Sequence, residues 1–328
     1  WKDDLFEVVL ASYYEERLKK RHKNPEDAYS VLRNNFLKRW KGRRIQDISR
    51  TTVKTALKEM VEGGMGGGAN RALDYLKTMF NWLVDEDRLA VSPCTKVQNP
   101  VPEVSRDRVL SDEEIVYFWR ATGRKEYPYG PFFRMLLLTA QRRNEIADAR
   151  WSEFDRFFHV FRLPGVRSKN GKPQDIELPR QLTEIVESLP RVQLDGKISP
   201  YLFTTTGRTA ISGFSRGRQI LRRMMLEEAR KQAEIDGHPV DLVEIEHFTL
   251  HDLRRTATTG MAKIGVPANI ADSILNHSSG APSGVAAVYN RYEYADEKRE
   301  ALQRWADHVE KLVADYSAEA VVPMSAAR

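Results

Sequence analysis

Six residues whose side chains could together act on a phosphate lie scattered through the sequence. The arginines, lysine and histidines among them could bind a phosphate and move protons, and the tyrosine could attack it. A free tyrosine has a pKa of about 10, so it needs nearby cations or a base to act as a nucleophile at neutral pH. The set indicates attack on a DNA phosphodiester by a tyrosine without a metal ion. These residues are Arg142, Lys169, His251, Arg254, His277 and Tyr289.

The first arginine stands near the end of an apolar stretch, in the segment LLLTAQRRNE. Arg142 and Glu145 are three residues apart, which predicts that they share one helical face. A carboxylate at that position can hold the guanidinium in one rotamer. A surface ion pair is the alternative interpretation of the same spacing, and the agreement with the other motifs favours the site.

Lys169 directly precedes Asn170-Gly171, a dipeptide typical of a type I′ hairpin turn, because both turn positions need a positive φ. The lysine would then project from the tip of a hairpin able to enter a DNA groove. Cleavage by a tyrosine expels a 5′-oxygen, and a lysine whose pKa is lowered by neighbouring cations could protonate it. A lysine in a turn is ordinarily just exposed to solvent, which is the alternative interpretation. Lys172 is the other candidate for the general acid.

The segment HFTLHDLRRT places His251 and Arg254 three residues apart on one predicted helical face, with Thr249 as its cap. A second guanidinium would thus reach the same phosphate, and its hydrogen bonds would strengthen as the phosphorane gains charge. At about 1.5–3 kcal/mol for each charge-assisted bond, loss of either arginine should be severe. Arg255 should point elsewhere, to the DNA backbone or into a salt bridge.

Farther along, LNHSSG contains His277, and YNRYEY contains three tyrosines. Tyr289, Tyr292 and Tyr294 lie in a predicted helical region, where packing with the hydroxyl at the surface is the ordinary role. That role must hold for at least two of the three. The histidines and arginines above would supply the environment that activates the remaining one.

Composition indicates a globular protein with a polyanionic partner. With 328 residues, 41% of them apolar, the chain is long enough for two domains, and its formal net charge is +6. The single cysteine, Cys94, excludes an intrachain disulfide and a cysteine-based zinc site, as expected in a reducing bacterial cytoplasm. Apolar runs are too short to span a bilayer, and His251 and His277 lack metal-ligand spacing, so neither a membrane nor a metal is expected.

Apolar periodicity predicts a mainly α protein with a small antiparallel β-sheet, an α+β fold in two domains. Four amphipathic helices make the first domain, a helical DNA-binding bundle over residues 1–96. Their apolar positions fall within 6–13, 29–40, 53–60 and 73–83. The glycine-rich run 63–68 is a turn between the last two, since no Walker lysine follows it. Candidates for contact with the DNA backbone are Arg71, Lys77, Lys172 and Arg255.

Prolines without apolar periodicity predict a linker over 97–108. A capping box between Ser111 and Glu114 then begins the second domain, which is expected to span 109–316. Its expected elements are helices at 112–121 and 131–149, strands at 160–168 and 174–178, and mainly helices thereafter. Residues 317–328 are expected to form a loosely ordered tail.

Apolar residues recur on one face of a predicted helix near the C-terminus. They are Leu302, Trp305, Val309 and Leu312. This stripe could pack in cis on its own domain or dock on a neighbouring subunit, and both alternatives stay open.

The motifs together resemble those of the tyrosine recombinases of the phage integrase family, over essentially the whole chain. The family motif threonine-glycine-x-arginine-x-x-acid matches Thr139 to Glu145, with Ala140 in the place of the glycine. The first domain resembles the family's helical core-binding domain, and the second resembles its catalytic domain. The resemblance assigns the family's hairpin lysine, histidine-x-x-arginine pair and later histidine to Lys169, His251 with Arg254, and His277.

The resemblance places the nucleophile nine to ten residues after the later histidine, and Ala286 stands at the nine-residue position in this chain. A short insertion over 280–284 would carry Tyr289 to the equivalent position. Its VYNR context is similar to that of integrases of temperate phages and genomic islands. Tyr292 and Tyr294 remain rivals.

The resemblance implies that Tyr289 attacks the scissile phosphate of DNA, forms a 3′-phosphotyrosyl bond and releases a 5′-hydroxyl. A partner strand reverses the step, so neither ATP nor a divalent metal nor another cofactor is implied. Family members integrate or excise mobile elements as homotetramers on paired double-stranded attachment sites, through a Holliday junction, and accessory DNA-bending proteins can take part. Many also carry an arm-binding domain before the bundle, and a chain that begins at Trp1 favours truncation of such a domain.

Two other functions stay open. A type IB topoisomerase has similar cleavage chemistry but relaxes DNA as a monomer without two paired sites. A noncatalytic DNA-binding protein with a decayed site would lack some of the chemical residues, whereas all six positions are filled here. If the two basic domains close around DNA as a clamp, its binding should depend steeply on salt. The slope of log affinity against log salt concentration should be about −0.9 for each phosphate contacted.

Overall fold

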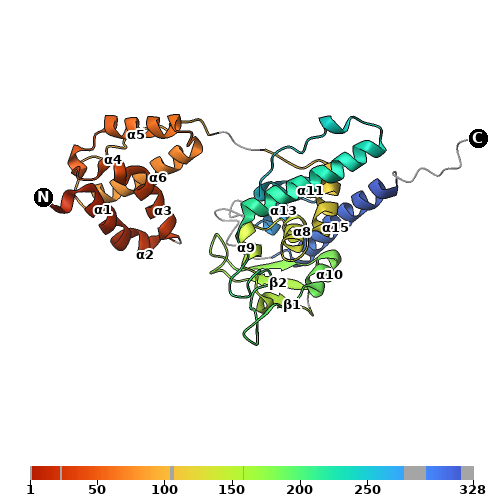
Figure 1. Ribbon diagram of the computed structural model, residues 1–328. Coiled ribbons are helices and arrows are strands. Elements are labelled where there is room, and N and C mark those ends of the chain that lie inside the picture. Colours follow the sequence, from red (N-terminus) through yellow and green to blue (C-terminus); the bar gives the residue numbers. More distant parts are fainter. Residues whose placement is uncertain (1, 23, 104–106, 158, 277–292, 319–328) are drawn as a thin grey trace, which may run out of the picture. The chain divides into compact units, whose positions relative to one another are not determined.

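The computed structural model describes residues 2–22, 24–103, 107–157, 159–276 and 293–318. The chain folds into two compact units, Trp1–Arg106 and Asp107–Arg328, and each has its own buried apolar core (Figure 1). Helices dominate both units, and the second also contains small antiparallel sheets, which confirms the predicted fold class. None of the described helices is long and apolar enough to cross a membrane.

The first unit contains the four predicted helices. The two earlier ones continue through π-helical turns at Tyr14–Leu18 and Arg33–Leu37. The apolar face of each helix is buried, and Phe6 packs edge to face on Trp40 with ring centroids 5.2 Å apart. The helices are α1 (Phe6–Tyr13) with α2 (Lys19–Arg21), α3 (Pro25–Leu32) with α4 (Lys38–Trp40), α5 (Arg50–Glu62) and α6 (Gly67–Asp85).

The segment after α6 stays attached to the first unit for longer than expected. Val97 is only 4% exposed and belongs to the core of this unit. Asn70 on α6 donates to the Val101 carbonyl at 2.9 Å and accepts from its amide at 3.2 Å. The first part of the expected linker, 97–108, therefore packs on the bundle, because a buried valine and paired backbone groups hold it there.

The second unit is built around α8 (Tyr129–Thr139), which contacts helices on several sides. The predicted capping box at Ser111 is confirmed. The Glu114 amide donates to the Ser111 hydroxyl oxygen at 3.2 Å, and the Ser111 amide donates to the Glu114 carboxylate at 2.9 Å. The other helices are α7 (Asp112–Arg124), α9 (Arg143–Ala147), α10 (Arg180–Ser188), α11 (Phe214–Ile235), α12 (Leu250–Lys263), α13 (Ala268–Ile274) and α15 (Ala295–Ala318).

The larger sheet has the order β1-β2-β3 and is antiparallel throughout. Phe161 of β2 lies opposite Ile176 of β3, and both are buried under the helices. A second antiparallel pair lies farther along the chain. The strands are β1 (Phe154–Asp155), β2 (Val160–Leu163), β3 (Gln174–Glu177), β4 (Gln193–Leu194) and β5 (Lys197–Ile198).

The predicted hairpin at Asn170-Gly171 is wrong in its geometry. Strand β2 ends at Leu163 and β3 begins at Gln174, so residues 164–173 form a long loop. Within this loop only Gly171 has a positive φ, of 78°, whereas a type I′ turn needs two such residues. The loop is pinched at its base, where a Cβ on Gly165 would lie 2.5 Å from the Gly171 carbonyl oxygen.

The predicted continuous helix over 131–149 is also wrong. Helix α8 ends at Thr139, and Ala140 takes a left-handed conformation with φ 55° before α9 begins at Arg143. An L-residue in this conformation costs roughly 1–2 kcal/mol, which glycine avoids. The glycine of the motif that this segment resembles would take the same conformation without that cost.

Of the two alternatives for the C-terminal helix, the structure has the cis arrangement. Trp305 of α15 is fully buried in the second unit, and its indole N–H donates to the Leu137 carbonyl at 3.0 Å. A Cβ on Gly260 of α12 would lie 2.2 Å from the Trp305 ring, so only glycine allows this approach. Helix α15 extends to Ala318, and the rest of the expected tail lies outside the described residues.

Candidate active site

Four of the six predicted chemical residues lie in the described part of the second unit. Arg142 immediately precedes α9, Lys169 lies in the loop 164–173, and His251 and Arg254 lie in the first turns of α12. Arg142 has extended backbone angles, φ −73° and ψ 142°, so it is the N-cap of α9 and not, as predicted, a residue on a helical face. The break at Ala140 is what turns it out of the helix.

Glu145 connects two of these residues. Its carboxylate accepts from the Arg142 guanidinium at 3.1 Å and from the Arg142 amide at 3.2 Å. The same carboxylate accepts from the Lys169 amide at 3.1 Å. Its side chain is only 3% exposed, so water competes little for these bonds. The carboxylate of Glu145, the predicted supporting residue, therefore holds both Arg142 and the loop 164–173, which contains Lys169 and is called the lysine loop below.

Arg254 is 4% exposed and is anchored by backbone groups. Its guanidinium donates to the Ala140 carbonyl at 2.7 Å and to the Leu275 carbonyl at 2.7 Å. An arginine has five N–H donors, so others remain for a phosphate. Burial lowers the pKa of Arg254 to about 10, and the charge of Arg142 contributes to the shift. Its bond to the Ala140 carbonyl attaches Arg254 to the segment that carries Arg142.

His251 faces several cations from the first turn of α12. Burial lowers its pKa most, and the charges of Arg255, Arg254 and Lys169 lower it further. The neutral imidazole is therefore favoured, which leaves a ring nitrogen able to accept a proton. Thr249 is the N-cap of this helix as predicted, and its amide donates to the Asp252 carboxylate at 2.7 Å.

The remaining chemical residues cannot be placed against this centre. His277 and Tyr289 lie outside the described residues, as does the rival Tyr292. The other rival, Tyr294, is half-buried against the core of the second unit and has a φ of 52°. The nucleophile assignment therefore stays a prediction from the sequence.

An arginine that the sequence reasoning missed braces the lysine loop. Arg167 makes a bidentate pair with Glu153, at 2.8 Å from Nε and 2.6 Å from Nη2, and the two side chains are 14% and 8% exposed. Its third nitrogen donates to the Glu145 carbonyl at 3.3 Å. No periodicity or spacing signal marks this pair, because its members come from separate elements.

The predicted DNA-backbone residues have different environments. Arg71 is paired with Asp27, which also accepts from the Tyr75 hydroxyl at 2.6 Å. Lys77 is half-buried. Arg255 forms the expected salt bridge, with the fully buried Asp252. Lys172 is exposed on the lysine loop, beside the site.

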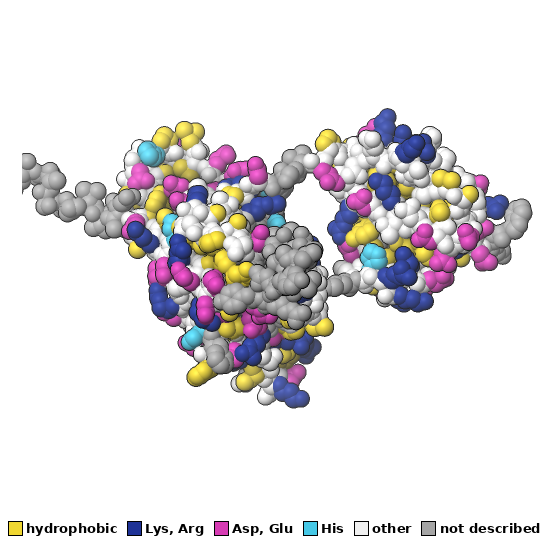
Figure 2. All heavy atoms as spheres, turned by 180° about the vertical axis from the view of Figure 1, so that it is seen from behind, with side chains coloured by type: hydrophobic (Ala, Val, Ile, Leu, Met, Phe, Trp, Pro, Cys, Tyr) yellow, Lys and Arg dark blue, Asp and Glu magenta, His cyan; other side chains and the backbone are white. Residues whose placement is uncertain are grey.

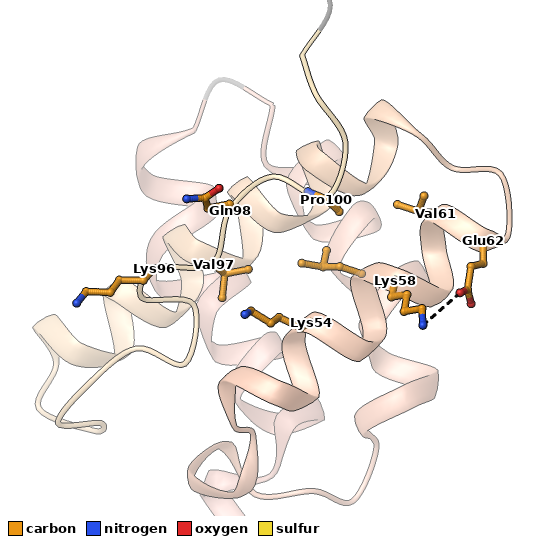
Figure 3. Close-up of a pocket in the computed structure, with 9 residues that line it drawn as sticks. Lys54, Lys58, Val61, Glu62, Lys96, Val97, Gln98 and Pro100 are labelled. Carbon is orange, nitrogen blue, oxygen red and sulfur yellow. Dashed lines mark ion pairs between the residues drawn. The ribbon is translucent and has the colours of Figure 1, made fainter.

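Three lysines that the sequence reasoning did not single out border a groove in the first unit. The groove has a volume of about 620 Å³ and lies between α5 and the segment 96–100 (Figure 3). Lys54 and Lys58 come from α5, and Lys96 comes from the facing segment. Lys58 also lies 3.7 Å from Glu62. In the sequence, the four-residue spacing of Lys54 and Lys58 could have indicated that these two lysines share one face of a helix.

Charge by itself does not outline a binding face on the side of the molecule that Figure 2 shows. Figure 2 shows Lys and Arg side chains interspersed with Asp and Glu on both units. Among the described residues, no three His, Cys, Asp or Glu side chains are grouped as a metal site. Cys94 is buried, and burial raises the pKa of its thiol to about 12.

Comparison with known proteins defines the family. The sequence profile of the phage integrase family matches residues 108–295, more than half of the chain and all of the described site. The chain therefore belongs to the phage integrase family.

Its curated relatives are remote in sequence. The prophage integrase IntA of Escherichia coli K12 is 26% identical over 177 residues, which cover 54% of this chain and 38% of the relative. The XerC-like tyrosine recombinase of Caldanaerobacter subterraneus is 22% identical over 266 residues, which cover 73% of this chain and 66% of the relative. The chain thus spans about two fifths of the length of the prophage integrase.

Solved structures share the fold. A fragment of lambda integrase, bound as a dimer to a COC′ core site, superposes with a TM-score of 0.61 at 15% identity, over 84% of this chain and 96% of the fragment. The Tn1549 transposon integrase, in complex with a circular intermediate DNA, gives 0.60 at 16% identity, over 90% and 99%. Both units of the chain therefore have counterparts in proteins of this architecture.

Proposed function

We propose that the protein is a site-specific tyrosine recombinase that cleaves and rejoins DNA through a 3′-phosphotyrosyl intermediate, to integrate or excise a mobile element. One observation carries the proposal. Residues from three separate elements meet here: the Arg142 guanidinium and the Lys169 backbone amide bond the buried carboxylate of Glu145, and Arg254 bonds the carbonyl of Ala140, two residues before Arg142. This arrangement places several cations where a phosphate would gain negative charge.

The arginines bind the scissile phosphate in this proposal. Arg254 is held by two carbonyls and Arg142 by Glu145, so neither guanidinium has to reorganise when the phosphorane forms. The hydrogen bonds strengthen as charge develops on the nonbridging oxygens. This preorganisation supplies the binding energy without a divalent cation.

Proton transfers complete the step. The Tyr289 oxygen forms a bond to phosphorus while the bond from phosphorus to the 5′-oxygen breaks. The Lys169 ammonium gives its proton to the leaving 5′-oxygen. A neutral His251, or His277, takes the tyrosine proton or stabilises the phosphate. Attack by the 5′-hydroxyl of a partner strand on the phosphotyrosine reverses these transfers and rejoins DNA.

The proposed partners are double-stranded attachment sites and further copies of the chain. Lambda integrase has been solved as a tetramer bound to a Holliday junction, and this chain matches that structure with a TM-score of 0.61 at 15% identity. We propose the same tetrameric assembly on two paired sites, with DNA-bending proteins as accessories, in the cytoplasm of a bacterium.

Covalent capture tests this function. The protein is incubated in EDTA with a library of nicked random-sequence duplexes, quenched with SDS, and the DNA-linked peptide is identified by mass spectrometry. We expect a 3′-phosphotyrosyl adduct on Tyr289. An adduct on Tyr292 or Tyr294 would move the nucleophile. Tight DNA binding without any adduct would contradict the enzyme, and relaxation of supercoiled plasmid by the monomer without paired sites would favour a topoisomerase.

Glu145→Gln is expected to slow adduct formation by about 100-fold, because an NH₂ group replaces one carboxylate oxygen and then faces N–H donors of Arg142 or Lys169, which displaces them. DNA affinity should change little, since the site's other cations remain. Single-turnover capture on the selected DNA measures the rate. The control is Glu184→Gln, at an exposed ion pair with Arg180, which should stay within about twofold. Equal rates for both variants would contradict the role of Glu145.

The three groove lysines are proposed to bind DNA phosphates. Replacing Lys54, Lys58 and Lys96 together by glutamine should reduce the slope of log affinity against log salt by about 0.9 for each phosphate that is no longer neutralised. Fluorescence anisotropy over a series of salt concentrations measures the slope. Lys19→Gln removes an exposed lysine that is paired with Glu15 and serves as the control. An unchanged slope in the triple variant would exclude the groove from the DNA interface.

A further inference from the structure

The lysine loop is bonded to the end of α13, a helix from a distant part of the chain. The Asn170 side-chain amide donates to the Asn276 carbonyl at 2.8 Å and to the Asn276 side-chain oxygen at 3.0 Å. Asn170 is the residue after Lys169, and Asn276 is the residue before His277. These two bonds therefore join the positions next to two predicted catalytic residues.

The orientation of the Asn170 amide follows from its partners. Its oxygen accepts from the Lys172 amide at 3.1 Å and from the Ser168 hydroxyl at 2.6 Å. A backbone N–H can only donate, and a backbone carbonyl such as that of Asn276 can only accept. The amide oxygen therefore faces its own loop and the NH₂ group faces Asn276, so one side chain both shapes the loop and attaches it.

The end of α13 is also where Arg254 is held. The Leu275 carbonyl accepts from Arg254 at 2.7 Å. The Ile274 carbonyl accepts from Gln141 at 2.8 Å and from Gln174 at 2.7 Å. Carbonyls at a helix C-terminus have no partner within the helix, so they are open to such donors. Three successive carbonyls, 274 to 276, thus bind side chains from the elements that carry Arg142, Arg254 and Lys169.

The conformation of Asn276 suits this role. Its φ is 49°, in the left-handed region that asparagine tolerates better than most residues. This conformation lets the chain leave α13 while both the carbonyl and the side-chain oxygen face Asn170. Glycine would adopt the same backbone angle but would provide only the carbonyl.

We propose that Asn170 is a positioning residue. Its two hydrogen bonds to Asn276 hold Lys169 beside the three successive carbonyls of residues 274 to 276, one of which binds Arg254. The role rests on the proposed function, in which Lys169 gives its proton to the leaving 5′-oxygen. Lys169 is exposed, and its backbone is fixed on one side by Glu145. Asn170 fixes the other side, so the ammonium has a defined reach.

Asn170→Asp isolates the bond to Asn276. The aspartate keeps an oxygen for Lys172 and Ser168 but loses both donors and places a carboxylate against the Asn276 carbonyl. Asn276→Gly is a second variant, which keeps the backbone angle and the carbonyl acceptor and removes only the side-chain oxygen. Asn269→Asp, exposed at the other end of α13, makes the same charge change away from the bond and is the control.

The first test needs no DNA. Hydrogen-exchange mass spectrometry on the full chain should show faster exchange in peptides covering 165–173 and 268–276 for Asn170→Asp, with a smaller change for Asn276→Gly and none for Asn269→Asp. Unchanged exchange in both peptides would overturn the proposal, whether or not the protein cleaves DNA. Absence of any adduct with the natural chain would instead overturn the proposed function.

The second test separates positioning of the acid from general loss of structure. It uses the captured DNA sequence with either an oxygen or a sulfur at the 5′-bridging position, because a thiolate leaves without protonation. Asn170→Asp should cleave the oxygen substrate about 100-fold more slowly than the natural chain. On the sulfur substrate the two rates should agree within about threefold. Equal slowing on both substrates, or no slowing on either, would overturn the role assigned to Asn170.

Discussion

Tyr289→Phe is expected to abolish the covalent adduct, with a loss of at least about 10⁴-fold in cleavage, because phenylalanine has no oxygen to attack phosphorus. DNA affinity should change by no more than about twofold, since the phosphate is bound by the arginines and not by the nucleophile. Single-turnover capture on the selected DNA measures the first quantity, and fluorescence anisotropy measures the second.

The neighbouring tyrosines make matched controls for that experiment. Tyr292→Phe and Tyr294→Phe change the same atom in the same segment, and both should retain the adduct. Retention of the adduct in Tyr289→Phe, with loss in one of the other two, would reassign the nucleophile within the same enzyme class. Retention in all three would contradict tyrosine attack from this segment.

Arg254→Lys should slow adduct formation by about 10²–10⁴-fold. A lysine ammonium keeps the charge but cannot bind the Ala140 and Leu275 carbonyls and also present paired N–H groups to a phosphate. Two charge-assisted hydrogen bonds of about 1.5–3 kcal/mol each give this range of rates. At pH 7 the Arg254 guanidinium is protonated, since its pKa is about 10, so the natural side chain meets the phosphate as a cation.

Arg255→Lys is the control on the same helix. The lysine can still pair with Asp252, so we expect at most a severalfold loss. Thermal unfolding of both variants shows whether the buried carbonyls left by Arg254→Lys also reduce stability. A rate for Arg254→Lys close to that of Arg255→Lys would contradict direct phosphate binding by Arg254.

Local sequence determined the helices, their buried faces and the residue types of the site. The capping box at Ser111, the N-cap at Thr249 and the apolar stripe around Trp305 were predictable, because each depends on residues within a few positions of one another. The motif spacings likewise singled out Arg142 and Arg254 as candidates, because the chemistry restricts which residue types can serve.

The tertiary structure alone decided how those residues are held. The break at Ala140 overrides a continuous apolar pattern, because the Ala140 carbonyl is turned toward Arg254, 114 residues away. Asn170 does not form the predicted tight turn: it lies in the loop 164–173, and its side chain bonds Asn276, 106 residues away. Periodicity and turn preferences describe interactions within a few residues, whereas these bonds form between elements that meet only when the core has packed.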